Sequence, residues 1–199
     1  MSENNERISK VTRTTKETDI TATFNLDGKG RSEINTGIGF FDHMLDGFTR
    51  HGLFDMKLTA KGDTDVDCHH TIEDTGIVIG EAISKAAGDK KSIKRFGYFI
   101  LPMDDALILC AVDLSGRPYL NFEVDFPTQK CGDLDTEMIR EFFYAVSYSA
   151  GMNIHIKQLS GINSHHIAEA SFKAFAKSLA MAVEKDPRIE DVLSTKGKL

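Results

Sequence analysis

Two copies of a His-His-x-x-Glu motif are the residues of this chain best suited to chemistry. One copy runs from His69 to Glu73 and the other from His165 to Glu169, so the two pairs hold four of the seven histidines. Imidazole nitrogens and carboxylate oxygens at this spacing are typical ligands of a borderline divalent cation. Because the pattern occurs twice in similar local settings, we expect a metal-dependent catalyst.

Each motif opens a segment with the periodicity of a helix. On a helix, residues i and i+4 share one face, while residue i+1 points about 100° away. His69 and Glu73 can therefore bind one ion together, and the second motif can bind another in the same way. We expect the second histidine of each motif to complete the other motif's site, with His166 joining the first and His70 the second. The sequence leaves open whether the motifs meet within one chain or between subunits.

Two further residues complete the predicted ligand set. His43 lies near the start of an earlier helix. Its counterpart in the second half, found by the shift that relates Gly52 to Gly151, falls one residue from Glu141. We expect His43 and Glu141 to bind one ion each. Nitrogen and oxygen ligands without thiolate favour Mn²⁺ or an Mg²⁺-like octahedral site with open positions, and Zn²⁺, Fe²⁺ and Co²⁺ remain chemically allowed.

The composition limits the class of protein. With 199 residues, of which 41% are hydrophobic and 27% charged, the chain can bury a core. A net charge of -6 argues against a nucleic-acid partner, which would need a basic face. We expect no membrane association and no signal peptide, because long apolar runs are missing from the sequence. The odd number of cysteines indicates a reducing compartment, so we expect a cytoplasmic protein.

The two halves of the chain repeat one order of elements. The first half has strand-like runs and helical stretches at residues 8–16, 19–26, 31–36, 40–50 and 53–60, then the helix of the first motif. The second half has them at residues 94–101, 106–114, 118–124, 135–149 and 152–159, then the helix of the second motif. We predict an α+β fold of duplicated β-β-β-α-β-α half-domains, related by a pseudo-twofold axis, each a mixed sheet with helices on one face. The half-repeats span residues 1–92 and 93–199, the second with a substrate-binding tail, in one compact domain.

Several short segments accompany the two metal motifs in order: Arg13–Thr18, Gly37–Phe41, Phe41–Leu45 and Ser194–Gly197. Together they resemble the imidazoleglycerol-phosphate dehydratases of histidine biosynthesis, from about Arg7 to the C-terminus. The resemblance implies a hydro-lyase that converts D-erythro-imidazole glycerol phosphate to imidazole acetol phosphate. It also implies two Mn²⁺ ions per active site and a homo-oligomer of 24 chains built from trimers, with sites at subunit interfaces.

The resemblance also assigns roles to individual residues. The implied metal ligands are His43, His69, His70, Glu73, His165, His166 and Glu169. Glu141 stands where a histidine is often found, so it would ligate through oxygen, or water would fill the place. The implied substrate-binding residues are Glu17, His51, Arg95, Arg117, Lys173, Ser194 and Lys196. Gly47 stands where many relatives carry glutamine, and a substrate contact would be lost there.

The substrate's reacting C–H bond is not acidic, because no carbonyl group is next to it. We expect the imidazole ring to lose its N–H proton and to bridge both metals as an imidazolate, which expels the neighbouring hydroxyl group. The resulting diazafulvene-like intermediate acidifies the adjacent C–H bond, and a carboxylate removes that proton. The catalytic candidates are Glu17 and Glu169, and their order as acid and base stays open.

Two other functions remain open from the sequence. A binuclear metallohydrolase acting on a small phosphoester would use an Asp-rich site, which Asp63, Asp65 and Asp67 could supply. A metal-storage shell would bind ions without turnover. An assay with imidazole glycerol phosphate and with phosphoesters distinguishes the three functions.

Overall fold

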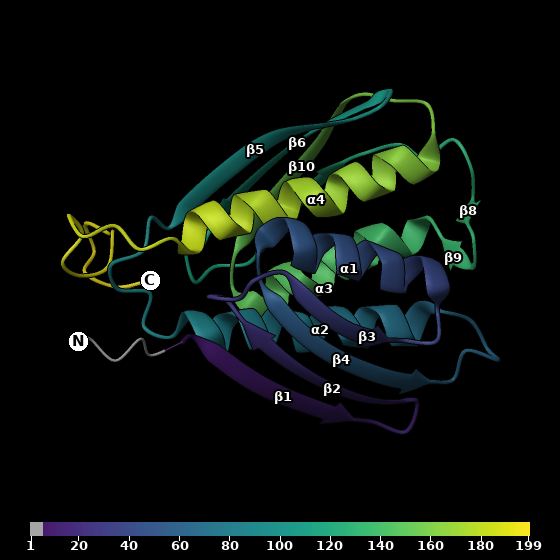
Figure 1. Ribbon diagram of the computed structural model, residues 1–199, viewed down its shortest axis with the longest axis horizontal. Coiled ribbons are helices and arrows are strands. Elements are labelled where there is room, and N and C mark those ends of the chain that lie inside the picture. Colours follow the sequence, from purple (N-terminus) through teal and green to yellow (C-terminus); the bar gives the residue numbers. More distant parts are fainter. Residues whose placement is uncertain (1–5) are drawn as a thin grey trace.

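The chain folds into two four-stranded sheets with helices between them, as the computed structural model of residues 6–199 shows (Figure 1). The first half consists of β1 (Ile8–Thr14), β2 (Thr18–Asn25), β3 (Arg31–Asn35), α1 (Gly39–Gly52), β4 (Asp55–Gly62) and α2 (His69–Ala87). The second half consists of β5 (Phe96–Met103), β6 (Ala106–Asp113), β7 (Tyr119–Glu123), β8 (Lys130–Cys131), β9 (Leu134–Asp135), α3 (Glu137–Ala150), β10 (Asn153–Ser160) and α4 (Ser164–Val183). The predicted α+β fold with duplicated half-domains is confirmed.

Both halves build their sheets in the same way. The strand order is β1-β2-β4-β3 in the first sheet and β5-β6-β10-β7 in the second. The pairing is parallel between β3 and β4 and between β7 and β10, and antiparallel elsewhere in these sheets. A parallel pair needs a crossover connection, which α1 and α3 supply. Buried residues alternate along the strands, as Ile20, Ala22 and Phe24 do on β2, so one face of each sheet packs against helices.

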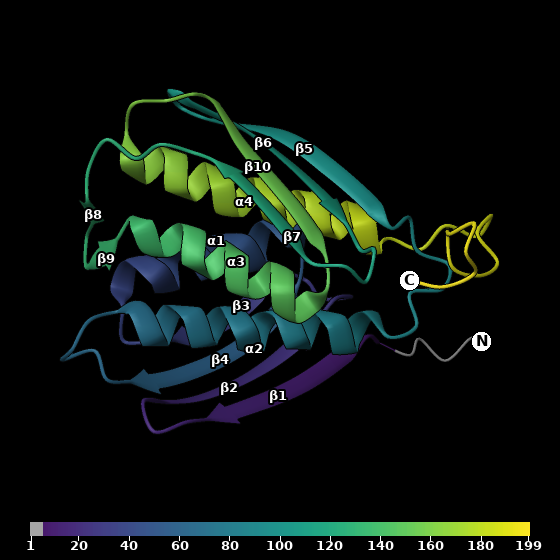
Figure 2. The same ribbon diagram turned by 180° about the vertical axis from the view of Figure 1, so that it is seen from behind.

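The helices pair between the two halves. α1 packs on α4, and α2 packs on α3, while α2 and α4 also cover the sheets of their own halves. The view from behind shows α3 beside α2, with α4 under the second sheet (Figure 2). Gly76 and Gly80 allow the close approach of α2 to α3, because an added Cβ at either would lie 2.8 Å from a side-chain carbon of α3. Residues of both halves are therefore brought together at each helix pair.

Phenylalanine rings fill the space between the two helix pairs. The ring centroid of Phe142 on α3 lies 5.4 Å from that of Phe41 on α1 and 5.1 Å from that of Phe172 on α4. All three side chains are buried. Burying a ring of this size stabilises the fold by about 1.5–3 kcal/mol. This core fixes the helices against one another and so fixes the side chains of their first turns.

The hairpin of β8 and β9 is an element that the sequence pattern does not predict. Each of its strands has two residues, which is too short for alternation to be detected. The hairpin lies at the end of the molecule where the four helices begin (Figures 1 and 2). The Asp133 carboxylate in its turn accepts hydrogen bonds from the N–H groups of Gly39 and Phe40. The second half thus caps the helix of the first half that carries His43.

The two halves are joined by a short connection between α2 and β5. The predicted boundary at residue 92 lies in this connection. Ile93 forms an isolated bridge with Lys185, which follows α4, so the connection contacts the start of the C-terminal tail. None of the helices between residues 6 and 199 has the length and apolar character needed to cross a membrane.

Candidate active site

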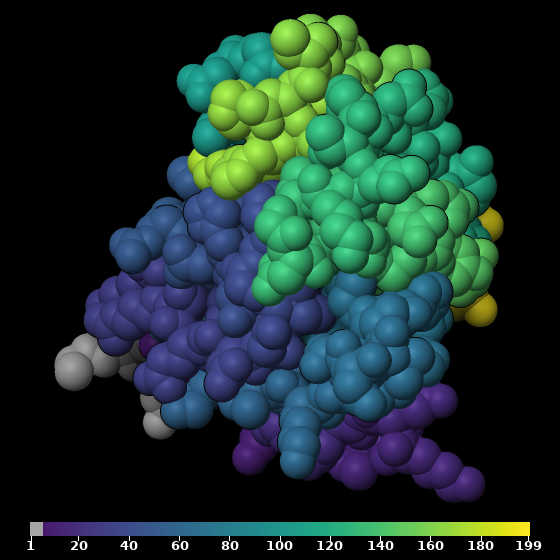
Figure 3. Space-filling model, turned by 90° about the vertical axis from the view of Figure 1, so that its right-hand side faces the viewer, coloured from purple at the N-terminus to yellow at the C-terminus, as the bar shows by residue number. Residues whose placement is uncertain are grey.

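The two His-His-x-x-Glu motifs form the first turns of α2 and α4. Asp67 accepts a hydrogen bond from the His69 N–H at 2.8 Å, and Asn163 accepts one from the His165 N–H at 2.9 Å. Such acceptors satisfy N–H groups that a helix leaves unpaired at its start. Both motifs lie at the end of the molecule where the helices begin, and in Figure 3 this end shows surfaces from both halves side by side.

Three side chains from α1 and α4 form a candidate metal-binding group, which could hold an ion. The ligand atoms of His43, His165 and Glu169 all lie within 4.8 Å of one another. Oε2 of Glu169 is 3.3 Å from Nε2 of His165 and 3.9 Å from Nε2 of His43. The ring of Phe40 packs edge-on against the His165 ring, with centroids 5.1 Å apart. Among residues 6–199, no second group of three or more such ligands is this closely spaced.

Lys173 contacts the other carboxylate oxygen of Glu169. Its Nζ lies 2.6 Å from Oε1, and both side chains are largely buried. Burial raises the pKa of Glu169, but the hydrogen bond and charge of Lys173 outweigh it, so the pKa is below its ordinary value. Glu169 is therefore ionised at neutral pH, with Oε2 facing two imidazoles. Burial, and then the charges of Lys173 and Lys177, lower the pKa of His51, which lies in the last turn of α1.

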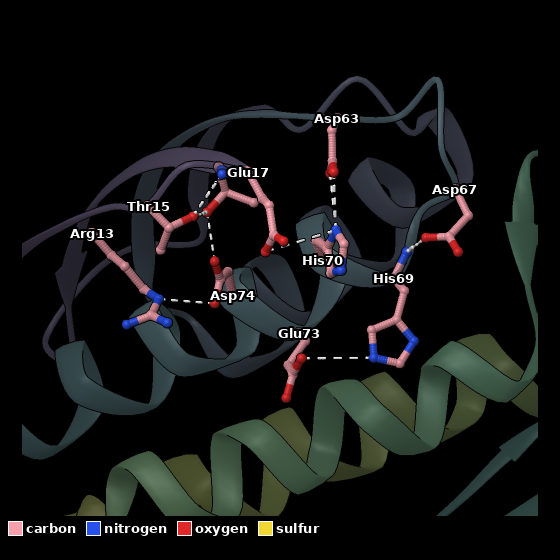
Figure 4. Close-up of polar contacts among 10 residues, drawn as sticks. Arg13, Thr15, Glu17, Asp63, Asp67, His69, His70, Glu73 and Asp74 are labelled. Atoms are coloured by element: carbon pink, nitrogen blue, oxygen red, sulfur yellow. Dashed lines mark hydrogen bonds and ion pairs between the residues drawn. The ribbon is translucent and has the colours of Figure 1, made fainter.

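The first motif forms a matching pair on α2. Nε2 of His69 lies 3.6 Å from Oε2 of Glu73 (Figure 4). Glu141, predicted as a further ligand beside His69, Glu73 and His166, pairs instead with the neighbouring Arg140 at 2.9 Å. In the described part of the chain, Glu141 does not lie close enough to His69 and Glu73 to share an ion with them. The second group is therefore less complete within one chain than the first.

The helix ends make Glu141 the structural counterpart of His43. Both α1 and α3 have 14 residues, and each is followed by a residue in the left-handed conformation. Glu141 is the fifth residue of α3, as His43 is the fifth residue of α1. The shift from Gly52 to Gly151 points one residue further, to Phe142, because the two glycines hold different positions relative to their helices. Phe142 is a core residue and cannot bind an ion.

The second histidine of each motif points away from the first. Nδ1 of His70 lies 3.0 Å from Asp63 and 3.9 Å from Glu17, on the side of α2 away from Glu73 (Figure 4). Nδ1 of His166 lies 2.6 Å from Asp105. The hydrogen bond to the aspartate is the main reason that the pKa of each of these histidines is raised.

The predicted exchange of second histidines between motifs does not occur within one chain. The described residues do not bring His166 to His69 and Glu73, nor His70 to the second motif. The reason is the pairing of the helices, because α2 packs on α3 and α4 packs on α1, so the two motifs begin helices of different pairs. Asp63 and Asp105, which contact these histidines, are not in the predicted ligand set, and the sequence offers no signal for Asp105.

The predicted substrate-binding residues are divided between the two ends of the molecule. Glu17, in the turn between β1 and β2, lies beside His70. Arg95 donates a hydrogen bond to the Leu193 carbonyl and pairs with Asp113 at 2.7 Å, which holds the tail near the end of α4. α4 has 20 residues and so a length of about 30 Å. Ser194, next to Leu193, therefore lies far from the His165 of its own chain.

Two further predicted substrate-binding residues, Arg117 and Lys196, also lie near the C-terminal tail. Arg117 lies in the connection between β6 and β7, where its Nη1 contacts the Ser115 carbonyl at 3.4 Å. Gly116 beside it is close to Leu199 at the end of the tail. The Lys196 N–H donates to Oγ of Ser194 at 3.2 Å. Arg95, Arg117, Ser194 and Lys196 thus share the end of the molecule away from the metal-binding group.

Comparison with known proteins gives one consistent result. Residues 36–179 match the family described as imidazoleglycerol-phosphate dehydratase. The imidazoleglycerol-phosphate dehydratase of Lachnoclostridium phytofermentans is 61% identical over 191 residues, which cover 96% of this chain and 97% of that protein. The enzyme of that name from Acetivibrio thermocellus is 56% identical over 98% of this chain and 100% of its own length.

Solved structures agree with the sequence relatives. The crystal structure of imidazoleglycerol-phosphate dehydratase from Staphylococcus aureus matches with a TM-score of 0.82 and 40% identity, over 90% of this chain and 99% of its own. The structure from Pyrococcus furiosus has the same TM-score and identity, over 95% and 100% of the two chains. These likenesses give no support to a metallohydrolase. The chain therefore belongs to the imidazoleglycerol-phosphate dehydratase family, and it is a hydro-lyase of the dehydration step in histidine biosynthesis.

Proposed function

We propose that this dehydration takes place at a site for two Mn²⁺ ions, built from the second motif of one chain and the first motif of another. The group of His43, His165 and Glu169 carries the proposal, because three ligand atoms lie within 4.8 Å of one another. Its nitrogen and oxygen donors, without thiolate, suit Mn²⁺. The ionised Glu169 directs one oxygen at both imidazoles.

The other chain would supply the first motif. His69 and Glu73, with Glu141 as the counterpart of His43, would bind the second ion. His70 would then reach the ion of the second motif, and His166 would reach that of the first. This arrangement explains why His70 and His166 point away from the other ligands of their own motif. It also accounts for the distance of about 30 Å along α4 between the metal-binding group and the tail, because a neighbour's tail can approach the site.

The outer face of the second sheet supports an oligomer. The outer face of the second sheet exposes apolar side chains, of which Phe96 is 50%, Tyr98 68% and Ile100 51% exposed on β5. The corresponding face of the first sheet carries charged and polar side chains such as Lys57 and Lys61. An exposed apolar patch of this kind is typical of an interface. We propose that copies of the chain cover it, in a homo-oligomer of 24 chains built from trimers.

The roles of the side chains in the reaction follow from their positions. Bound Mn²⁺ would act as a Lewis acid that stabilises the negative charge on the substrate's imidazole ring. Glu17 is half-exposed beside His70, where its carboxylate is free to exchange a proton with the substrate. Glu169 is ionised and is the second candidate for proton transfer. The substrate's phosphate would be bound by imidazole, cationic and hydroxyl groups, namely His51, Arg95, Arg117, Lys173, Ser194 and Lys196.

The small phosphorylated substrate and the unpaired cysteines are typical of a cytoplasmic enzyme, which is the location that we propose.

The substrate and the metal are tested together on the purified protein. We expect turnover of imidazole glycerol phosphate that is lost on chelation and regained with Mn²⁺, and bound metal without turnover would instead indicate a storage shell. Glu17→Gln should keep its metal content and lose rate more than substrate binding. Loss of assembly in this variant would make Glu17 structural.

Complementation between two inactive variants tests whether the site lies between chains. His165→Ala removes the second motif and His69→Ala removes the first. Co-expressed with different affinity tags, the two variants form mixed oligomers in which some sites combine an intact second motif with an intact first motif. We expect activity to return in oligomers that carry both tags. If both tags co-purify and no activity returns, the motifs do not meet between chains.

A further inference from the structure

We propose that Asp63 and Asp105 are positioning residues, each of which holds the second histidine of one motif with its Nε2 directed outward as a metal ligand. The proposal rests on the metal site proposed above and assigns a role to two aspartates outside that site. Nδ1 of His70 lies 3.0 Å from Oδ2 and 3.2 Å from Oδ1 of Asp63. Nδ1 of His166 lies 2.6 Å from Oδ1 of Asp105.

The two histidines of each motif use opposite ring nitrogens. His69 and His165 turn Nε2 toward the glutamate of their own motif, at 3.6 and 3.3 Å. His70 and His166 instead turn Nδ1 toward an aspartate. A neutral imidazole carries its proton on one nitrogen, and an ionised carboxylate can only accept. The aspartate therefore fixes the proton on Nδ1 and leaves the lone pair on Nε2, the atom that would bind a metal. Nε2 of His166 also lies 3.4 Å from Oδ2 of the exposed Asp104, whereas Asp105 contacts Nδ1.

The two aspartates do not descend from one position of the repeat. Asp63 is seven residues before His70, in the loop between β4 and α2, whereas Asp105 is 61 residues before His166, in the turn between β5 and β6. The halves share their strand order and both motifs, but each reaches this contact from a different element. A contact inherited by duplication would use matching positions. The same hydrogen bond formed in two separate ways indicates a requirement of the histidines.

The two anchors differ in rigidity. Oδ2 of Asp105 accepts hydrogen bonds from the N–H groups of Ile162 at 2.6 Å and Asn163 at 3.0 Å, which ties the β5–β6 turn to the start of α4. Among the described residues, the carboxylate of Asp63 has hydrogen bonds to His70 alone. Substitution of Asp105 would also remove its hydrogen bonds to the backbone at the start of α4. A change in metal binding could then come from the loss of the contact with His166 or from the altered backbone. Asp63 therefore gives the cleaner test.

The test compares Mn²⁺ binding by the metal-free, full-length protein and three variants. Asp63→Ala removes the anchor. Asp63→Asn keeps an oxygen that can accept from Nδ1 but removes the charge. Asp65→Ala, in the same loop and exposed, is the matched control. Titration calorimetry with Mn²⁺ alone gives the affinity and the number of ions, and the melting temperature of each metal-free protein reports on the fold. Loss of such a partner typically weakens metal binding by about 10–100-fold.

We expect Asp63→Ala to weaken Mn²⁺ binding by about tenfold or more, Asp63→Asn to recover part of this loss, and Asp65→Ala to match the wild type. Wild-type affinity in Asp63→Ala would overturn the positioning role alone. An equal loss in the Asp65→Ala control would also overturn it, because the cause would then be the charge of the loop. Asp63 would instead be structural if Asp63→Ala lowers both the Mn²⁺ affinity and the melting temperature, and if Asp63→Asn does not restore the affinity. A wild-type protein that binds no Mn²⁺ would instead refute the metal site itself.

Discussion

Substitution of Gly76 by alanine tests whether close contact between α2 and α3 is required. A Cβ at Gly76 would lie 2.8 Å from Cβ of Ala145 and 2.9 Å from the carbonyl oxygen of Phe142. Ordinary carbon–carbon contact is about 3.5–4.0 Å, so the helices would have to move apart by roughly 1 Å. Overpacking of this kind costs about 1–3 kcal/mol, whereas alanine gains about 1 kcal/mol of helix propensity over glycine. We therefore expect a net destabilisation of up to about 2 kcal/mol.

Gly47 provides a matched control for this substitution. It also lies inside a helix, α1, but a Cβ there would meet no atom within 4 Å. Gly47→Ala should therefore be stabilising by about 0.5–1 kcal/mol, from helix propensity alone. The measurement is urea denaturation of the metal-free proteins followed by circular dichroism, and the difference between the two variants isolates the packing cost. If Gly76→Ala is as stable as Gly47→Ala, the helices do not need the close contact.

Three further predictions follow from individual side chains. Glu169→Gln should abolish turnover and weaken Mn²⁺ binding, since the carboxylate faces both His165 and His43; steady-state rates like those of the wild type would exclude a catalytic role. The hydrogen bond from Arg7 holds the pKa of Asp27 below its ordinary value of 3.8, so this contact stabilises the fold above that pH and is lost as the pH falls through the lowered pKa. The stability gap between wild type and Asp27→Asn should then be largest at neutral pH and should close in acid, and a gap that is independent of pH would contradict this. Burial raises the pKa of the Cys110 thiol to about 12, so native protein at pH 8 should resist maleimide labelling at Cys110 until it is unfolded, as peptide mass spectrometry would show.

Local pattern in the sequence was enough to identify all the elements except the short β8 and β9 strands. Strand alternation and helix periodicity depend on residues two to four positions apart, so each half could be divided into its strands and helices without knowledge of the fold. The ligand types were also local, because a histidine and a glutamate four residues apart must share a helix face. The short β8 and β9 strands escaped detection because two residues show no period.

Contacts between distant segments could not be obtained in this way. Glu141 was assigned through Gly52 and Gly151, which hold different positions relative to the two helix ends, and only the observed helices show that it corresponds to His43. The grouping of His43 with the second motif depends on the packing of α1 on α4, which the core phenylalanines determine.

The sequence by itself determined the repeated halves, the two metal motifs, the resemblance to the dehydratases and the outward direction of the second histidines, because each depends on neighbours along the chain. Only the tertiary structure decided that helices pair between halves, that Asp63 and Asp105 contact His70 and His166, and that the tail lies at the far end of α4. These features depend on which surfaces pack together, and packing joins residues whose separation in sequence carries no signal.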